Sequence, residues 1–357
     1  MDVQVLVDSG EFWDRLREDF EGARQTAFVQ TFTFEGDRVG TMLARALERC
    51  TATDRRFLVD GYSLLYHSDR LIVSQAWLDR DFRREVFLTH SWVRHLRRNG
   101  FGVRFSNPVG PSPMRLVRRN HKKLVVVDGV VYLGGMNFSE HNFAWHDMML
   151  RVESPRLAGI LAEDFDASWE GRSRPMDRMV DPFRLLSLNG RGNARGLAPV
   201  LEALAGSRRS IDVQSAYLSH PFTRHLADAR ARGVRVRVLT PANNNKGNLA
   251  RHIRHTAYRH DFEVYARAGM SHLKAMLIDD ELLVTGSSNF DFMSYHIFEE
   301  LIVMTRDPSI VDAYRRRVWE PDLRRAERIR PRPDFGTRLG HAAVRLGARM
   351  AEFLALP

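Results

Sequence analysis

Two stretches of the sequence, HKKLVVVDGVVYLGGMN (121–137) and HLKAMLIDDELLVTGSSN (272–289), decide the fold. Each begins with His-x-Lys, runs through apolar residues to an aspartate, and ends on a glycine-containing turn followed by an asparagine. The Asp128-Gly129 pair between LVVV and VVYL is typical of a hairpin turn. The two stretches therefore predict a basic β-hairpin at equivalent places in two halves of one chain.

The segments around these hairpins repeat in the same order. RQTAFVQTFTF (24–34) resembles RRSIDVQSAYL (208–218), and each leads through a helix-like stretch to a second apolar run. A third run, the hairpin and a last strand follow, so the order is β-α-β-α-β-hairpin-β, twice. Apolar runs without alternation favour central strands that are covered by helices on both faces. We predict an α/β fold of two similar α/β-sandwich halves, each a mixed β-sheet flanked by helices, with pseudo-twofold symmetry.

Composition shifts divide the chain. The segment 171–195 is rich in Gly, Pro and Arg, which is typical of a linker. We therefore expect a first half at 1–185, a second half at 186–330 and a C-terminal tail at 331–357. The first half also contains an extra stretch, about 62 to 100, that the second half lacks.

The tail has the pattern of a basic amphipathic helix. Its arginines, Arg338, Arg345 and Arg349, stand apart from an apolar face. The residues expected on that face are Leu339, Ala342, Ala343, Leu346, Met350, Phe353 and Leu354. Such a helix either packs on the surface of its domain or lies in a membrane interface, and the sequence leaves both open.

Composition excludes several classes of protein. With 44% hydrophobic and 27% charged residues in 357, the chain is neither disordered nor fibrous. A single cysteine, Cys50, forms no internal disulfide and no cysteine zinc site, which suits a reducing compartment. No run of 18 apolar residues exists, and early acids in the N-terminus are untypical of a signal peptide. We expect a cytoplasmic protein, peripheral to a membrane.

The net charge of +10 indicates an anionic partner, either nucleic acid or an acidic lipid surface. Among the 54 basic residues only Lys122, Lys123, Lys246 and Lys274 are lysines. The arginine bias makes each remaining lysine a candidate for chemistry that a guanidinium cannot perform.

The His-x-Lys spacing predicts an anion site. Residues i and i+2 of a strand share a face, so His121 should lie beside Lys123, and His272 beside Lys274. A cation repels a metal ion, so we expect neither metal nor cofactor. Two lysines with the amides of Asn137 and Asn289 would bind a phosphate, while two histidines supply a nucleophile and a general acid. Asp128, seven residues after His121, should brace the hairpin instead of touching substrate.

These residues resemble the paired HKD motifs of the phospholipase D superfamily, over roughly residues 20 to 320. The bacterial cardiolipin synthase branch is the most similar, because Gly134-Gly135-Met136-Asn137 and Gly286-Ser287-Ser288-Asn289-Phe290-Asp291 follow the two motifs. The chain differs from that branch at His146 and Ile297, where arginine and asparagine are usual. The resemblance implies a phosphohistidine intermediate, with Asp147 and Glu299 orienting the two histidines. It also implies a catalytic set of His121, Lys123, Asp128, His272, Lys274 and Asp279.

We interpret the protein as a phosphatidyltransferase that acts on anionic phospholipid at a membrane surface, and we expect a monomer. Three alternatives stay open: hydrolysis to phosphatidic acid, a phosphodiesterase acting on nucleic acid, and a non-catalytic membrane-binding protein. Nucleic acid is disfavoured, since the basic patch at 118–123 has no interleaved aromatic residues to stack bases. The apolar part of the extra stretch, 62–78, either lines a lipid-accepting mouth or only packs.

Overall fold

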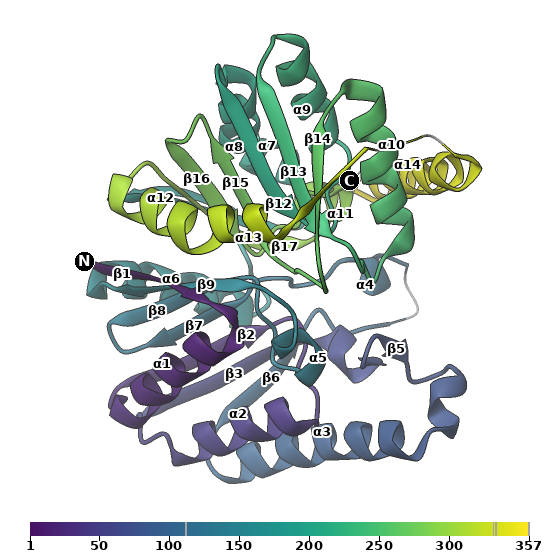
Figure 1. Cartoon of the computed structure of the whole chain (residues 1–357). Coiled ribbons are helices and arrows are strands. Elements are labelled where there is room, and N and C mark those ends of the chain that lie inside the picture. Colours follow the sequence, from purple (N-terminus) through teal and green to yellow (C-terminus); the bar gives the residue numbers. More distant parts are fainter. Residues whose placement is uncertain (111–112, 331, 333, 356–357) are drawn as a thin grey trace. The chain divides into compact units, whose positions relative to one another are not determined.

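Each copy of the sequence repeat forms a mixed β-sheet flanked by helices in a computed structural model of the chain, which confirms the predicted fold class (Figure 1). The structure describes all residues except 111–112, 331, 333 and 356–357. The chain divides into two units, Met1–Arg174 and Pro175–Pro357. Each unit has its own sheet and its own core.

The first unit is built on a seven-stranded sheet of order β1-β9-β8-β7-β2-β3-β6. Strands β2, β3 and β6 are parallel, whereas β7, β8, β9 and β1 follow as antiparallel neighbours. The strands are β1 (Asp2–Val7), β2 (Thr26–Thr31), β3 (Asp54–Asp60), β6 (Gly102–Ser106), β7 (Leu124–Val127), β8 (Val130–Gly134) and β9 (Met148–Glu153).

Helices cover both faces of this sheet because β2 is apolar on both. Ala27 and Val29 lie in the core beneath α1 (Asp8–Gly22), α2 (Arg38–Arg49) and α3 (Arg80–Arg98). Phe28, between them, points the other way and stacks on Phe165 of α6 (Pro155–Trp169), with ring centroids 4.8 Å apart. The short helices α4 (Pro113–Val117) and α5 (Glu140–Phe143) flank the hairpin.

The extra stretch of the first unit is shorter than the sequence suggests. Helix α3 connects β3 to β6 as α10 connects β13 to β14 in the second unit, so it has a counterpart. The added part comprises η1 (Gly61–Leu64), β4 (Tyr66–His67), β5 (Arg70–Leu71) and η2 (Gln75–Leu78). Charged residues on α3 hid its amphipathic pattern and made the insertion look longer.

The second unit contains a nine-stranded sheet of order β10-β11-β17-β16-β15-β12-β13-β14-β18. Its strands are β10 (Met176–Val180), β11 (Phe183–Asn189), β12 (Ser210–Ser215), β13 (Arg235–Pro241), β14 (Glu263–Arg267), β15 (Lys274–Ile278), β16 (Leu282–Gly286), β17 (Glu299–Thr305) and β18 (Glu327–Ile329). One face is covered by α7 (Asn193–Gly196), α8 (Ala198–Gly206), α9 (Phe222–Ala231), α10 (Gly247–His260) and α11 (Phe292–His296). The other face packs against α12 (Pro308–Tyr314), η3 (Arg315–Trp319) and α13 (Glu320–Arg325) through Tyr314 and Trp319.

The segment 171–195, which its composition marks as a linker, contains two strands instead. Strand β10 pairs with β11, and β11 pairs with β17, so this segment forms an edge of the second sheet. The side chains of Leu185, Leu186 and Leu188 are buried there. Flanking arginines and glycines concealed this apolar run from a composition argument.

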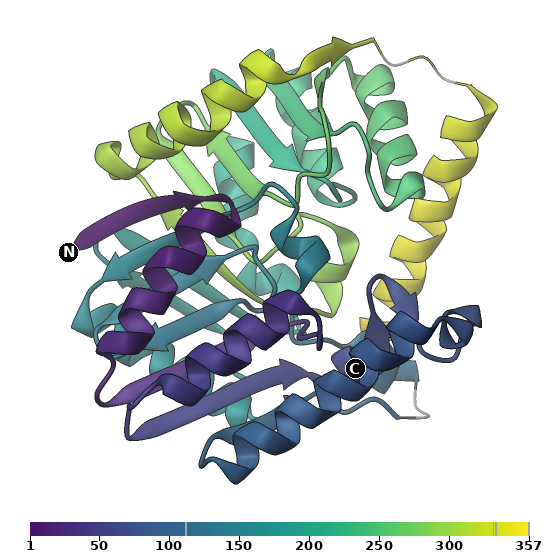
Figure 2. The ribbon, with the colours of Figure 1, turned by 60° about the horizontal axis from the view of Figure 1, so that its bottom comes forward.

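The tail forms one long helix, α14 (Phe335–Ala355), that packs along α10 and contacts α11 (Figure 2). Residues 331, 333, 356 and 357 of the expected tail lie outside the described residues. Among the helices of the described ranges, none combines the length and the apolar character that crossing a membrane requires.

Candidate active site

The first motif lies at the entrance to strand β7. His121 and Lys123 precede the strand, which begins at Leu124, and they are 5% and 1% exposed. The Lys123 ammonium turns back and donates to the backbone oxygen of His121 at 2.7 Å. Lys122 points to the opposite side, where its Nζ lies 2.8 Å from Asp164 on α6. The expected alternation therefore holds, although the motif stands before the strand and not within it.

The second motif repeats this geometry. Lys274 is the first residue of β15, and its Nζ donates to the backbone oxygen of His272 at 2.5 Å. His272 and Lys274 are 6% and 2% exposed. An aromatic ring packs edge-on against the histidine of each motif: Phe32 against His121 at 5.1 Å, and Tyr217 against His272 at 5.8 Å between ring centroids. Each unit therefore presents one imidazole, one ammonium and one aromatic ring as a preformed set.

Three rings form a continuous row that ends at His121. Tyr66 stacks on Tyr62 with centroids 5.1 Å apart, and Tyr62 stacks on Phe32 at 5.9 Å. Phe32 also lies beneath the Lys123 ammonium, 5.4 Å from its ring centre. Burial raises the pKa of both tyrosine hydroxyls, which stay neutral. This aromatic row (Phe32, Tyr62, Tyr66) connects the inserted stretch to the first motif.

The two asparagines follow the hairpins as the pattern indicates. Asn137 Nδ2 donates to Asn142 Oδ1 at 3.3 Å, and the side chain is 4% exposed. Asn289 is held by its backbone, whose oxygen accepts from Ser215 Oγ at 2.9 Å. The side-chain oxygen of Asn289 is buried and has no hydrogen-bond partner in the part of the chain that the structure describes. A buried amide with unused capacity is suited to a ligand.

The two motif aspartates occupy hairpin turns and hold backbone groups. Asp128 accepts from the N–H groups of Arg24, Gln25 and Thr26 at 3.0, 2.9 and 2.8 Å. Asp279 accepts from Arg208, Arg209 and Ser210 at 2.9, 2.7 and 2.9 Å. Both have left-handed backbones, with φ of 49° and 55°. Burial alone would raise each carboxyl pKa, but these backbone donors outweigh it and hold the pKa below its ordinary value. Bracing of the hairpin by Asp128 is confirmed.

The acids proposed to orient the histidines stand at the last strands. Asp147 precedes β9 and Glu299 begins β17, and they are 2% and 6% exposed. A Cβ on Gly135 would lie 2.5 Å from the Asp147 carboxylate oxygens, so a larger residue there would have to displace that carboxylate. The next residue of the second unit, Glu300, is fully buried and accepts from the hydroxyls of Ser287 and Ser294. The orienting roles of Asp147 and Glu299 stay predictions.

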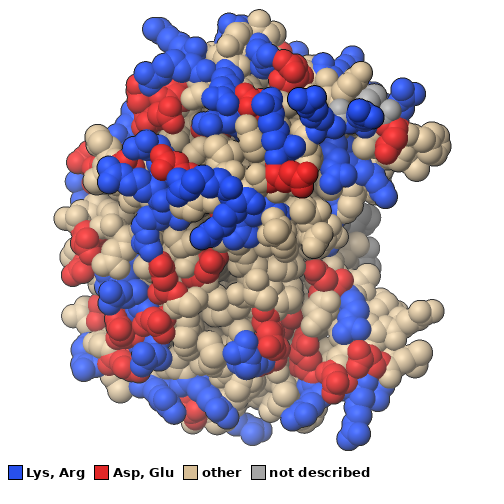
Figure 3. Space-filling view, viewed as in Figure 1, with Lys and Arg blue, Asp and Glu red and all other residues tan. Residues whose placement is uncertain are grey.

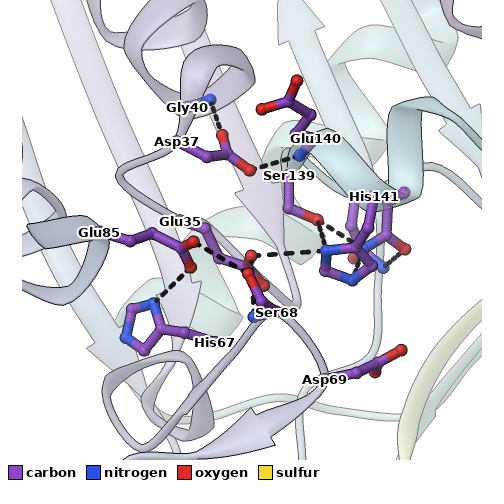
Figure 4. Close-up of polar contacts among 12 residues, drawn as sticks. Glu35, Asp37, Gly40, His67, Ser68, Asp69, Glu85, Ser139, Glu140 and His141 are labelled. Atoms are coloured by element: carbon purple, nitrogen blue, oxygen red, sulfur yellow. Dashed lines mark hydrogen bonds and ion pairs between the residues drawn. The ribbon is translucent and has the colours of Figure 1, made fainter. Parts of the chain in front are cut away.

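A second buried polar cluster, absent from the sequence argument, anchors the inserted stretch (Figure 4). Glu35 Oε2 lies 3.5 Å from His141 Nδ1 and accepts from the Ser68 N–H at 3.1 Å. Ser68 Oγ donates to Glu85 at 2.9 Å, and His67 Nδ1 lies 3.6 Å from the same carboxylate. Burial would lower the pKa of His141, but Glu35 outweighs it and raises that pKa. The cluster ties the inserted stretch to α3 and α5.

At the edge of this cluster, Asp37 caps helix α2. It accepts from the Gly40 N–H at 2.8 Å and from the Glu140 N–H. Burial raises its pKa to about 6. No group of three or more His, Cys, Asp or Glu side chains in the described part of the chain is arranged to hold a metal ion.

Several contacts of the site could not be found from spacing alone. Lys122 has no polar counterpart in the second motif, where Leu273 occupies the equivalent position. The sequence repeat therefore provides no indication that Lys122 pairs with Asp164. His146, noted as a departure from the resembled branch, lies with its Nδ1 2.6 Å from Asp8 Oδ1. Phe32 and Tyr217 follow their strands at offsets that differ by one residue, which hid their common role.

The chain is similar in sequence and in fold to known proteins. The family model described as cardiolipin synthase, PLD-like domain, matches residues 16–169 and 200–320. Cardiolipin synthase A of Pseudomonas putida (strain W619) is 26% identical over 377 residues, covering 99% of this chain and 74% of that protein. The cardiolipin synthase of Listeria welshimeri is 24% identical, covering 83% of this chain and 64% of its own. The crystal structure of a phosphatidylserine synthase from Haemophilus influenzae shares the fold, with a TM-score of 0.74 at 12% identity, covering 99% of this chain and 95% of that one. The family model spans well over half of the sequence and includes both His-x-Lys motifs, so the chain belongs to the cardiolipin synthase family with a phospholipase D-like domain.

Proposed function

We propose that the protein is a phosphatidyltransferase of the cardiolipin synthase type, working through a phosphohistidine. His121 attacks the phosphorus of a phospholipid, so that a P–N bond forms and the P–O bond to the headgroup alcohol breaks. His272 gives its proton to the departing alcohol. It then takes a proton from the hydroxyl of a second phospholipid, whose oxygen attacks phosphorus and releases His121. With phosphatidylglycerol as both partners, the products are cardiolipin and glycerol.

The duplicated histidine and lysine geometry carries this proposal. In each unit a lysine side chain lies folded over the backbone of its histidine, 2.7 Å from the oxygen of His121 and 2.5 Å from that of His272. Two such sets acting on one phosphate would neutralise its charge and divide nucleophilic and acid-base work between two imidazoles. The division requires unlike imidazole pKa values in the two units.

The aromatic row supports transfer to an alcohol over transfer to water. Hydrolysis and transesterification share the first half-reaction, so the acceptor that reaches the phosphohistidine decides the product. Tyr62 and Tyr66 place apolar rings beside Phe32 and His121. The inserted stretch also exposes Val73 and Leu78, at 85% and 81%. Such a surface suits a lipid acceptor, whose acyl chains would displace water from it.

The basic surface supports the nucleic-acid alternative only weakly, because acidic side chains lie among its arginines. Figure 3 shows Lys and Arg side chains gathered over the α12–α13 region of the second unit, with acidic side chains among them. Arg315 and Arg316 lie 2.5 Å from Asp312, and Arg315 also reaches Glu320 at 3.2 Å. Arginines that are already paired with carboxylates are less available to a phosphate backbone.

The proposal is tested on His121→Ala and His272→Ala with phosphatidylglycerol vesicles. Each substitution should lower kcat on the order of 10³-fold or more, because one removes the nucleophile and the other the acid-base partner. His95→Ala and His225→Ala, on α3 and α9, serve as matched controls and should stay active. Rapid acid quench should trap phosphate on His121, and label on His272 would reverse the assignment.

Product analysis separates the alternatives. Mass spectrometry should find cardiolipin and glycerol in excess over phosphatidic acid. Phosphatidic acid alone, even with excess alcohol, would identify a hydrolase, and cleavage of single-stranded DNA with no turnover of lipid would identify a nuclease. We further propose that the enzyme acts as a monomer on the cytoplasmic surface of a membrane. Light scattering and sedimentation with vesicles would test that.

A further inference from the structure

Helix α14 packs on the second unit through its smallest side chains. The buried residues of this helix are Thr337, Gly340, Val344, Ala348 and Ala351. They recur every three or four residues and so form one stripe of the helix. Gly340 lies tightly on α10, because a Cβ there would come 2.6 Å from the Cβ of Arg251. Of the two alternatives that the sequence leaves open, packing on the domain is observed, but through a face other than the large apolar one.

The large apolar side chains of α14 lie on the opposite face and are exposed. The apolar row consists of Phe335 (82% exposed), Leu339 (60%), Leu346 (61%), Met350 (58%) and Phe353 (74%). At about 100° per residue these five fall on one side of the helix, roughly opposite the buried stripe. A helix that buries glycine and alanine while exposing phenylalanine and leucine presents a surface that a second apolar phase would cover.

An arginine row borders the apolar row along one edge. Arg338, Arg345 and Arg349 recur at helical spacing and are exposed. Two of them, Arg345 and Arg349, line a cavity of about 440 Å³ between α9, α10 and α14. Arg224 and Arg259 line the same cavity, against two carboxylates, Asp228 and Glu352. The balance of charge in the cavity is positive.

The wall of this cavity holds histidines with unused hydrogen-bonding capacity. His252 is 2% exposed, and neither of its ring nitrogens has a hydrogen-bond partner among the described residues. Its ring stacks on His341 with centroids 4.8 Å apart, and His341 lies 4.2 Å from His255. Burial, assisted by the neighbouring histidines and Arg345, lowers the pKa of His252 to about 3 and that of His341 to about 4. An anion in the cavity would accept a hydrogen bond from a neutral ring N–H and offset the positive charge of the arginines that line it.

We propose that α14 and this cavity form a docking surface for an anionic phospholipid bilayer. The apolar row would enter the interface between headgroups and acyl chains, while a lipid phosphate would occupy the cavity beside the arginine row. The occupant follows from the complementarity, because an anionic group joined to an apolar phase is the chemistry of such a lipid. The inference deepens the proposed function, but no residue of the surface belongs to either His-x-Lys motif.

Site-specific labelling tests the contact directly. Cys50, the sole cysteine, is buried at 2% exposure, so an environment-sensitive fluorophore would react with an introduced Leu346→Cys side chain. We expect a blue shift of its emission on vesicles containing phosphatidylglycerol and little change on pure phosphatidylcholine. The same label at Met179→Cys, on β10, should not respond. Equal responses at both positions, or none at Leu346→Cys, would overturn the proposal.

Matched substitutions test the energetic contribution of each row. Met350→Gln should weaken binding to phosphatidylglycerol vesicles several-fold, whereas Met179→Gln, with a similar exposure of 63%, should leave it unchanged. Replacing Arg338, Arg345 and Arg349 by Gln should weaken binding at least tenfold. A control that replaces Arg306, Arg316 and Arg324 removes the same charge from the same unit and should have a clearly smaller effect. Equal losses in the two triple variants would show that only net charge matters.

Three further measurements keep the outcomes distinct. Turnover of a soluble phosphodiester should be unchanged in every α14 variant, so a failure of docking is separate from a failure of the chemistry. Competition by inorganic phosphate against vesicle binding distinguishes a free-phosphate site from a lipid headgroup site, and full displacement at low millimolar phosphate would contradict docking. A change of oligomeric state in the apolar variants, with vesicle binding intact, would make this face an interface between two copies.

Discussion

Lys122 and Lys123 are neighbours of the same type with opposite surroundings. The Lys123 ammonium donates to the backbone oxygen of His121, whereas Lys122 forms a buried ion pair with Asp164. Alternation of side chains along an extended chain separates the two. The sequence predicts this alternation but not the partner of Lys122, because a contact 42 residues away depends on how α6 crosses the sheet.

Loss of the Lys122 ammonium should lower the free energy of unfolding and leave the kcat of the folded protein unchanged. We expect Lys122→Met to lower the free energy of unfolding by about 3 to 5 kcal/mol, since it removes the ammonium that balances the buried Asp164 carboxylate. The double variant that also carries Asp164→Leu should recover most of the lost free energy of unfolding. Urea titration gives the stability, and kcat of the folded fraction gives the chemistry. A loss of under 1 kcal/mol, as for the exposed Arg15–Glu18 pair, would contradict this account.

The turn aspartates should make stability depend on acidity. The folded pKa of Asp128 and of Asp279 lies below the ordinary 3.8, so their stabilisation is complete above that value and is lost as the pH falls through the folded pKa. Asp128→Asn or Asp279→Asn should cost about 1 to 3 kcal/mol near neutrality. The deficit should stay constant above about pH 5 and shrink only as the pH falls below 3.8 toward the lower folded pKa. Asp14→Asn, on the exposed side of α1, is the control, and a deficit that stays constant at low pH as well would refute the argument.

Among the elements, the inserted stretch could be predicted from the sequence only in part. Its aromatic and apolar residues are evident in the sequence, and a site-lining role was one of two interpretations. The stacking of Tyr66, Tyr62 and Phe32 toward His121 favours that role, while His67 and Ser68 anchor the stretch to buried carboxylates. That anchoring could not be predicted, because Glu35 and Glu85 reach it from separate elements.

Point substitutions in the aromatic row test its role better than deletion of the stretch. Deletion would also remove His67 and Ser68, which contact the carboxylates of Glu35 and Glu85. We expect Tyr62→Ala and Tyr66→Ala to admit water and to shift the products of phosphatidylglycerol turnover from cardiolipin toward phosphatidic acid, several-fold. Trp77→Ala, at the far end of the stretch and 46% exposed, is the control. Mass spectrometry measures the ratio, and an unchanged ratio in both tyrosine variants would assign the row to packing alone.

For the whole molecule, the repeat in the sequence was sufficient to predict two mixed sheets, their element order and the place of both motifs. Strands β10 and β11 were not predicted, because arginines and glycines surround their short apolar runs. The contact face of α14 was not predicted for a different reason. Hydrophobic patterning identifies large side chains, whereas this helix packs through small residues such as Gly340 and Ala348. Patterning identifies an amphipathic helix but not which face its own domain will cover.

The charge supplied by the chain predicts catalysis without an added divalent metal. If Lys123 and Lys274 neutralise the phosphate, turnover of a soluble phosphodiester should persist in excess chelator. The soluble substrate is needed because divalent ions also alter lipid surfaces. Activity that disappears with chelator and returns with zinc or magnesium would show that the anion site is incomplete without a metal ion.

The burial of three lysines has a consequence for covalent labelling. Lys122, Lys123 and Lys274 are 0%, 1% and 2% exposed, and Lys246 alone among the four lysines is exposed. An acylating reagent should therefore modify the lysines of the native protein at Lys246, and at the other three only when a unit opens. Mass spectrometry of peptides from each unit would then time the opening of the first unit through Lys122 and Lys123 and of the second through Lys274. Attachment through Lys246 would also give immobilised enzyme a nearly uniform orientation.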